Sequence, residues 1–343
     1  MKPSLPDSCG NCAPLSRRSF LTAAVATGAG MATSLPILGA ADTPAPKVAG
    51  KAEALVAEWF KSLSEEQRKA VAFDYHHPDR LRVENNWHIV EQRVGKIFNP
   101  DQQAMVREIF SKLHSEEYGD KVMQQFTEDN KGKGPATPEA VFGSSACAIF
   151  GTPGAGPYEF VFTGRHCTRR CDGDSESGVA FGGPIFYGHA AQGFYEKADH
   201  AGNVYWYQAE QANALFEALD GKQRNQALRD AEGREERGTD TVKLSRKKEG
   251  LEGIAMADLT TDQKALAQKV LSDLLLPFRK EDREEAMRLV TPQLDDLHFA
   301  YFKKQDIGSD KVWDVWQVEG PAMVWYFRGD PHVHTWVHIR SMA

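Results

Sequence analysis

Strand-like sequence occurs in two separate blocks, and this arrangement limits the possible folds more than any other feature of the chain. The first block lies between residues 144 and 188, where "CAIFG", "YEFVFTG" and "GPIFYG" are short, aromatic and β-branched segments separated by Gly/Pro turns. The second block is C-terminal and contains "LHFAYFKK", "VWDVWQV", "AMVWYFRG" and "VHTWVHI". Single strands and helices do not alternate regularly, which argues against a doubly wound parallel sheet.

Helical sequence precedes and separates the two strand blocks. Residues 51–118 carry apolar side chains at helical spacing, and further helices are expected at about 207–230 and 261–289. Separate runs of helices and strands are typical of α+β folds. The sequence therefore predicts a single α+β domain over residues 51–343. Its sheet should be mainly antiparallel, assembled from both strand blocks, with the helices packed around it.

Four helix starts share one local signal, which is an apolar residue, a capping side chain and a glutamine three positions after the cap. Such a glutamine can return a hydrogen bond to the backbone amide of the cap. Unequal intervals of 35, 121 and 40 residues separate the starts, which argues against stacked identical repeats. We interpret them as similar entries into separate helices. The four signals lie at residues 63–67, 98–102, 219–223 and 259–263.

The distribution of charge argues against some classes of partner. The net charge is −7, and the only basic cluster is the short one at residues 246–248, so electrostatic binding to nucleic acid or anionic lipid is not expected. That cluster belongs to a nearly all-polar segment, residues 229–250, which predicts an exposed loop rather than a partner-binding face. A small molecule is the expected substrate or ligand.

The N-terminus has the pattern of an export signal. "SRRSFL" at residues 16–21 matches the twin-arginine motif, and a weakly apolar stretch leads to small residues at 39–41. We expect residues 1–41 to be a cleaved signal peptide, residues 42–50 a flexible leader, and the mature protein periplasmic or extracellular. Retention as a membrane anchor is the alternative, although the Thr, Gly and Pro content makes a poor transmembrane helix. After cleavage, stable membrane insertion is not expected.

Three cysteines remain after cleavage, namely Cys147, Cys167 and Cys171. An oxidising compartment permits a disulfide. An extended chain would hold the Cα atoms of Cys167 and Cys171 roughly 13 Å apart, beyond the limit of about 7 Å for a bridge. A disulfide between them would need a tight turn, and buried free thiols are the alternative.

The stretch "GDPHVHTWVHI" places three histidines near the C-terminus. Alternate residues of a strand share a face, so His332, His334 and His338 should point the same way. Cα atoms two residues apart are about 6.6 Å apart and within reach of one ion, whereas His332 and His338 are roughly 20 Å apart. His332 and His334 therefore form a candidate metal-binding pair. Solvated or hydrogen-bonded histidines on an edge strand are the alternative.

Further candidates lie in the first strand block. His166 follows a strand that ends in "FTGRH", and His189 closes "GGPIFYGH"; each is a candidate ligand or an ordinary turn histidine. Asp172 and Asp174 could accept hydrogen bonds from a ligating imidazole, and Asp174 is the candidate base for a metal-bound water. Arg165 could hold an anionic substrate group through its guanidinium, or pair with a surface carboxylate.

Four blocks of the chain together resemble the bacterial and fungal family called domain of unknown function 3500. They are "NNWHIVEQRVGKIFNPDQQAMVREIFS", "FTGRHCTRRCDGDSESGVAFGGPIFYGH", "YQAEQANALFEALDGKQRNQAL" and "VWDVWQVEGPAMVWYFRGDPHVHTWVHI", and the similarity extends from roughly residue 52 onward. Members commonly show Gly-His-His after a central strand and Asn-His-Ile-His-Thr near the C-terminus. Here these motifs read Gly164-Arg165-His166 and Pro331-His332-Val333-His334-Thr335.

The resemblance implies that the two histidine motifs act together. Arg165 replaces one histidine of the first motif, so the matched set is His166, His332 and His334. We predict that these residues hold one transition metal ion (zinc, copper or iron), with His189 or an aspartate as a candidate fourth ligand. Three neutral imidazoles leave an open position, which favours a metal-dependent hydrolase or oxidoreductase. A non-catalytic protein that binds a metal or a small ligand, or whose histidines are structural, is the alternative.

Overall fold

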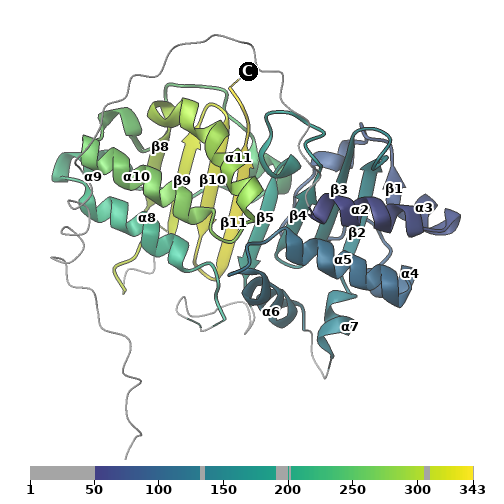
Figure 1. Cartoon of the computed structure of the whole chain (residues 1–343). Helices are drawn as coiled ribbons and strands as arrows, with labels where there is room; N and C mark the ends of the chain where they lie inside the picture. The colour runs from purple at the N-terminus through teal and green to yellow at the C-terminus, as the bar shows by residue number, and fades with distance from the viewer. Residues whose placement is uncertain (1–50, 132–135, 191–199, 201, 305–309, 343) are drawn as a thin grey trace, which may run out of the picture. The chain divides into compact units, whose positions relative to one another are not determined.

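The computed structural model describes residues 51–131, 136–190, 200, 202–304 and 310–342 (Figure 1). The described residues form one compact unit. The predicted signal peptide and leader lie outside the described residues. No helix in the described part of the chain is long and apolar enough to span a bilayer.

Both strand blocks contribute to one sheet, as the sequence predicted. Within the described residues the sheet has eleven strands in the order β1-β2-β3-β4-β5-β11-β10-β9-β8-β6, with β7 paired to β8. Most neighbours are antiparallel, and only β1 with β2 and β6 with β8 are parallel. The strands are β1 (Ala72–Phe73), β2 (Ala146–Gly151), β3 (Tyr158–Gly164), β4 (Cys167–Cys171), β5 (Ile185–His189), β6 (Leu228–Arg229), β7 (Ile254–Ala255), β8 (His298–Phe302), β9 (Val315–Gly320), β10 (Met323–Arg328) and β11 (Val333–Ile339).

The long helices lie over one face of the sheet (Figure 1). Their apolar stripes and that face share one large hydrophobic core, so the predicted α+β class is confirmed. The α-helices are α2 (Lys51–Ser62), α3 (Glu65–Val71), α4 (Val94–Ile97), α5 (Pro100–Lys112), α6 (Gly119–Asn130), α7 (Pro138–Phe142), α8 (Tyr207–Ala218), α9 (Gly221–Ala227), α10 (Thr261–Leu274) and α11 (Lys280–Val290). The short 3-10 helices are η1 (Pro78–Leu81), η2 (Ala180–Gly182), η3 (Gly238–Val242), η4 (Met256–Asp258) and η5 (Thr291–Asp296).

Loops rather than long helices pack on the opposite face. Val83 and Val242 pack there with Phe186 and Trp336 in a second, smaller core. Val242 belongs to residues 229–250, for which the sequence predicted an exposed loop. Many of its charged side chains are exposed, but its few apolar side chains are turned onto the sheet. Residues 229–250 therefore pack on the sheet through their apolar side chains and expose many of their charged side chains to solvent.

All four predicted helix starts are capping boxes. Their glutamines also bind one another in pairs. The side-chain amides of Gln67 and Gln102 exchange hydrogen bonds of 2.8 and 3.0 Å, and those of Gln223 and Gln263 exchange bonds of 2.8 and 2.7 Å. Each pair joins two helix N-termini, so the four starts fall into two equivalent sets.

These two sets belong to two equivalent halves, residues 51–190 and residues 202–342. Each half has a capping-box helix followed by a two-residue edge strand, then a meander of four longer antiparallel strands, β2–β5 or β8–β11. From either edge of the sheet, the order is therefore a two-residue strand followed by the four strands of a meander. The two halves meet where β5 pairs with β11. The unequal intervals rightly argued against stacked repeats, but they concealed this twofold arrangement.

The sequence retains traces of the equivalence at an offset of 156 residues. Arg68 stacks on Phe60 at 4.5 Å, and Arg224 stacks on Phe216 at 5.5 Å. Each arginine also donates a hydrogen bond to the carbonyl of its phenylalanine. The matched residues are Phe60 and Phe216, Leu63 and Leu219, Gln67 and Gln223, and Arg68 and Arg224.

Cys147, Cys167 and Cys171 are buried free thiols. Cys167 and Cys171 occupy the two ends of β4, whose extended backbone keeps them apart. Burial raises the pKa of Cys167 to about 11, so its thiol stays protonated at neutral pH.

Candidate metal centre

Three imidazoles meet at one end of the sheet, where the two halves join. His166 lies in the turn between β3 and β4, His332 immediately precedes β11, and His334 is the second residue of β11. One nitrogen from each ring lies within 4.8 Å of the others, and the residues are 7%, 6% and 5% exposed, respectively. The predicted convergence of histidines from the middle and the end of the chain is confirmed, and this buried group could hold a metal ion.

The Nε2 atoms are the ones that converge. Nε2 of His334 lies 3.0 Å from Nε2 of His332 and 3.2 Å from Nε2 of His166. Tetrahedral coordination at about 2.1 Å would place neighbouring nitrogen atoms roughly 3.4 Å apart. Both distances from His334 are therefore within a few tenths of an ångström of the spacing that one ion requires, and the whole group lies within 4.8 Å.

Backbone features bring the rings this close. His166 adopts a left-handed conformation, with φ of 52°, and its amide donates to the carbonyl of Asn85 at 2.9 Å. Gly188 is the cross-strand partner of His334. A Cβ atom at Gly188 would lie 2.2 Å from the carbonyl oxygen of Val333 and 3.3 Å from the ring of His334. This position therefore requires glycine.

Two carboxylates lie behind the imidazoles, on the Nδ1 side of the rings. Nδ1 of His166 lies 2.9 Å from Oδ2 of Asp129 in α6, and Nδ1 of His334 lies 2.5 Å from Oε2 of Glu236 and also contacts Nη2 of Arg328. Because an ionised carboxylate only accepts hydrogen bonds, we assign the ring proton of each histidine to Nδ1. A proton on Nδ1 leaves a lone pair on Nε2, which is the tautomer that can bind a metal. The hydrogen bonds thus aim both lone pairs at the shared centre.

Burial determines the charge states of one of these pairs. Burial lowers the pKa of His334 to about 3, although Glu236 acts to raise it. Burial acts to raise the pKa of Glu236, but the hydrogen bond with His334 and the hydrogen bond and charge of Arg328 hold it well below its usual value. At neutral pH the pair is therefore a neutral imidazole against an ionised carboxylate.

His189 does not join the group. It pairs with Val333 across the sheet, and the alternation of strand side chains directs it to the helix-covered face, opposite His334. Its Nε2 lies 3.3 Å from Nδ1 of His200, and both line a cavity of about 610 Å³ beside α6. His189, the candidate fourth ligand, thus lies on the opposite face of the sheet from His334.

Arg165 lies beside the centre, but its guanidinium serves the backbone. It donates to the carbonyls of Asp129 at 2.8 Å and Ala190 at 3.3 Å. Its own amide donates to the side chain of Asn130 at 3.2 Å. Arg165 therefore fixes the end of α6 next to His166. A contact with an anionic substrate group stays a prediction.

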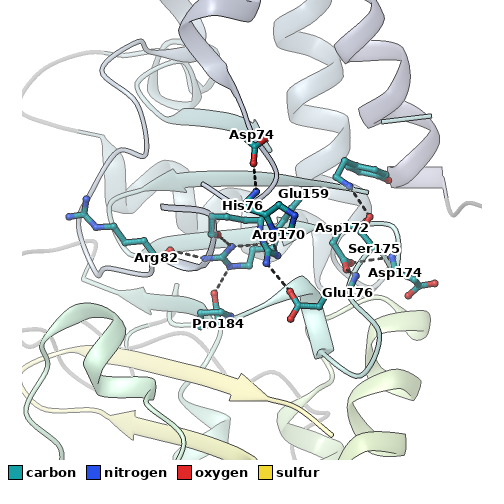
Figure 2. Close-up of polar contacts among 12 residues, drawn as sticks. Asp74, His76, Arg82, Glu159, Arg170, Asp172, Asp174, Ser175, Glu176 and Pro184 are labelled. Carbon is teal, nitrogen blue, oxygen red and sulfur yellow. Dashed lines mark hydrogen bonds and ion pairs between the residues drawn. The ribbon is translucent and has the colours of Figure 1, made fainter. Parts of the chain in front are cut away.

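Asp174 lies at the other end of β4 from His166, in the turn shown in Figure 2. A rise of about 3.3 Å per residue over the strand separates the two by roughly 16 Å. Asp172 organises this turn by accepting the amides of Asp174 at 3.3 Å and Glu176 at 3.2 Å. The expectation that either aspartate serves the histidines is not met, because β4 is fully extended.

His338 shares the face of His332 and His334, as strand alternation predicted, but stays outside the group. Its Nδ1 donates to the carbonyl of Val242 at 3.1 Å. Sequence reasoning missed Asp129 and Glu236, which lie 37 and 98 residues from the imidazoles they contact. No local motif marks either carboxylate, and only the meeting of distant segments reveals them.

Comparison with known protein families matches residues 45–343 to the family described as Protein of unknown function (DUF3500). No curated protein and no solved structure matches the chain. The matched region contains all three converging histidines and both carboxylates behind them. Because the match covers most of the sequence, the chain belongs to the DUF3500 family.

Proposed function

We propose that the protein is an exported metalloprotein that binds one transition metal ion through His166, His332 and His334. The observation that carries the proposal is the convergence of three Nε2 atoms in a buried place. With Nδ1 of His166 and His334 donating to carboxylates, two lone pairs face each other at 3.2 Å. A cation between them turns this repulsion into attraction. Zinc, copper and iron all accept such imidazole ligands.

We further propose that the ion serves a metal-dependent enzyme, a hydrolase or an oxidoreductase acting on a small molecule. Three neutral imidazoles leave a coordination position for water or substrate, as in catalytic sites. An ion held in this way can activate a water molecule or, if it is copper or iron, a redox substrate. The chain's contribution is to orient the rings and to exclude bulk water, since Phe186 packs 5.2 Å from the ring of His334.

One observation favours a second candidate, a non-catalytic ion that joins the two halves. His166 comes from the first half and the other two ligands come from the second, and all three are buried. An ion bound across this junction would stabilise the folded chain by its binding free energy. The two candidates differ in whether a coordination position is open to solvent molecules.

Elemental analysis of the full chain, purified with its native export signal, tests the metal site first. We expect about one equivalent of a transition metal, and its loss in His332→Ala with the fold retained in circular dichroism. Addition of azide to the Co²⁺-loaded protein then separates the candidates. A change in the visible spectrum supports an open position and catalysis, whereas an unchanged spectrum supports the non-catalytic ion.

Export through the twin-arginine route is part of the proposal and rests on "SRRSFL". It is tested by replacing Arg17 and Arg18 together with lysine in a host that has this route. We expect the mature protein to disappear from the periplasm or medium and the precursor to remain in the cells. Equal export of the parent and the variant would contradict this route.

A further inference from the structure

We infer that Asp129 and Glu236 are the positioning residues of this site, one supplied by each half and each from a different side of the sheet. The inference rests on the proposed metal site. Asp129 belongs to α6 in the first half, and Glu236 to the loop that covers the opposite face in the second half. Each half thus supplies one imidazole–carboxylate pair, His166 with Asp129 and His334 with Glu236.

The carboxylate of Asp129 is held rigidly. Its Oδ1 accepts the amide of Ala190 at 2.6 Å while Oδ2 accepts His166. The end of α6 that carries Asp129 is also fixed by Arg165, whose guanidinium donates to the carbonyl of Asp129. The side chain of Asn130 in turn binds both the amide and the carbonyl of Arg165. With both oxygens committed, the carboxylate can accept His166 from only one direction.

The carboxylate of Glu236 is held by a charge partner instead. Nε of Arg328 donates to Oε1 at 2.5 Å, and Nη2 of Arg328 lies 3.5 Å from Oε2, the oxygen that is 2.5 Å from Nδ1 of His334. Nη2 of Arg328 also contacts Nδ1 of His334. Nη1 of Arg328 donates to the carbonyl of Asp330 at 2.8 Å, just before the segment that carries His332. Arg328 therefore links the carboxylate to the backbone that presents the third imidazole.

Neither carboxylate is placed to act on a molecule at the metal. Each contacts the Nδ1 side of its ring, so the imidazole lies between the carboxylate and the converging Nε2 atoms. Their effect is exerted through the rings, by fixing the tautomer, increasing the basicity of Nε2 and balancing the charge of a divalent ion. This distinguishes them from Asp174, the base expected from sequence, which is remote.

Titration of Zn²⁺ and Co²⁺ into the metal-free full chain tests the inference, using Asp129→Asn and Glu236→Gln. We expect each variant to bind about 10- to 100-fold more weakly than the parent, with the larger loss for Glu236→Gln, which leaves Arg328 uncompensated next to His334. The visible bands of bound Co²⁺ should shift in both variants, because the ligand field of a reoriented imidazole changes. A purely structural role would leave that spectrum unchanged.

Glu176→Gln is the matched control. Glu176 is also a partly buried carboxylate paired with arginines, Arg80 and Arg340, but it contacts none of the three imidazoles. We expect parental affinity and a parental Co²⁺ spectrum. An equal loss in the control would overturn the inference, since general electrostatics would then explain the effect.

The outcomes separate the inference from the proposed function. A parent chain that binds neither ion overturns the proposed metal site itself. A parent that binds, together with variants of unchanged affinity and spectrum, overturns the positioning roles alone. Should a variant fail to fold, nitrogen-15 NMR of the metal-free parent decides. The inference predicts Nδ1–H tautomers for His166 and His334, and Nε2–H tautomers would contradict it.

Discussion

The two halves carry the same elements but different side chains at equivalent positions. In the first half, the turn after β3 reads Gly164-Arg165-His166 and presents an imidazole. In the second half, the turn after β9 begins with Gly320, at the offset of 156 residues, and continues with Pro321 and Ala322. The same turn therefore supports a candidate ligand in one half and only packing in the other.

The supporting charges also differ. At the histidine end, Glu236 pairs with Arg328 and an imidazole. The residue 156 positions earlier is Arg80, which instead pairs with Glu159 at 2.9 Å and Glu176 at 3.0 Å. Figure 2 shows this first-half region, where Arg170 binds Glu159 and the carbonyls of Arg82 and Pro184. In this first-half region, the arginines and carboxylates form ion pairs with one another.

This difference shows which part of the fold satisfies its polar groups without a ligand. The first-half region is closed by ion pairs and carbonyl contacts within the chain. At the histidine end, three ring nitrogen atoms converge, with separations of 3.0 and 3.2 Å from His334, in an arrangement that could hold a cation. Substitutions in the first region should therefore change stability, and those at the histidines should change metal binding.

The largest effect is expected for Arg170→Met. The side chains of Arg170 and Glu159 are fully buried, and this substitution removes the closer of the two arginines that pair with Glu159. It also removes the donor that binds the carbonyls of Arg82 and Pro184. We expect the free energy of unfolding, measured in urea, to fall by about 3–5 kcal/mol. Metal stoichiometry should stay at the parental value. Loss of metal from a folded variant would contradict the expectation that this region affects stability and not metal binding.

The next effect is expected for His166→Ala, which removes one of the three imidazoles. At a Zn²⁺ concentration of about 100 times its Kd, the parent should gain about 2.7 kcal/mol in free energy of unfolding, and the variant should gain nothing. Without metal, the two proteins should differ far less. Thermal unfolding with and without Zn²⁺ measures both quantities, and an equal gain in the variant would show that Zn²⁺ binds elsewhere.

Gly188→Ala tests the junction between the two halves, because it adds a single methyl group there. The added Cβ would collide with the carbonyl oxygen of Val333 and press on the ring of His334. We expect a loss of about 1–3 kcal/mol in free energy of unfolding together with weaker Zn²⁺ binding. Gly154→Ala is a poor control because its φ is positive, whereas Gly221→Ala meets open space and should change neither quantity.

The last effect is negligible at neutral pH and appears only on acidification. Burial, with Arg169 adding to it, lowers the pKa of His114 to about 3, so the folded protein keeps this ring neutral while the unfolded chain protonates it below about pH 6.5. Folding then loses stability as the pH falls from 6.5 toward 3, by up to about 1.4 kcal/mol per pH unit. We expect this slope to be smaller in His114→Gln when metal-free protein is unfolded in urea at several pH values. Parallel curves would contradict a buried neutral ring.

Local sequence predicted the elements well and the site in part. Capping pairs such as Ser64 with Gln67 define helix starts within a few residues, and strand alternation placed His332 and His334 on one face. His189 was proposed from its place at a strand end, and Asp174 from its nearness in sequence to His166. Their true positions depend on strand register and on the length of β4, which only tertiary pairing fixes.

X-ray absorption spectroscopy of the Zn²⁺-loaded full chain would identify the ligands of the ion. One ion held by His166, His332 and His334 predicts three imidazole nitrogen atoms at about 2.0–2.1 Å from the metal, with one ring fewer in each single histidine-to-alanine variant. A parent spectrum without imidazole scattering, or one that is unchanged in these variants, would contradict the account.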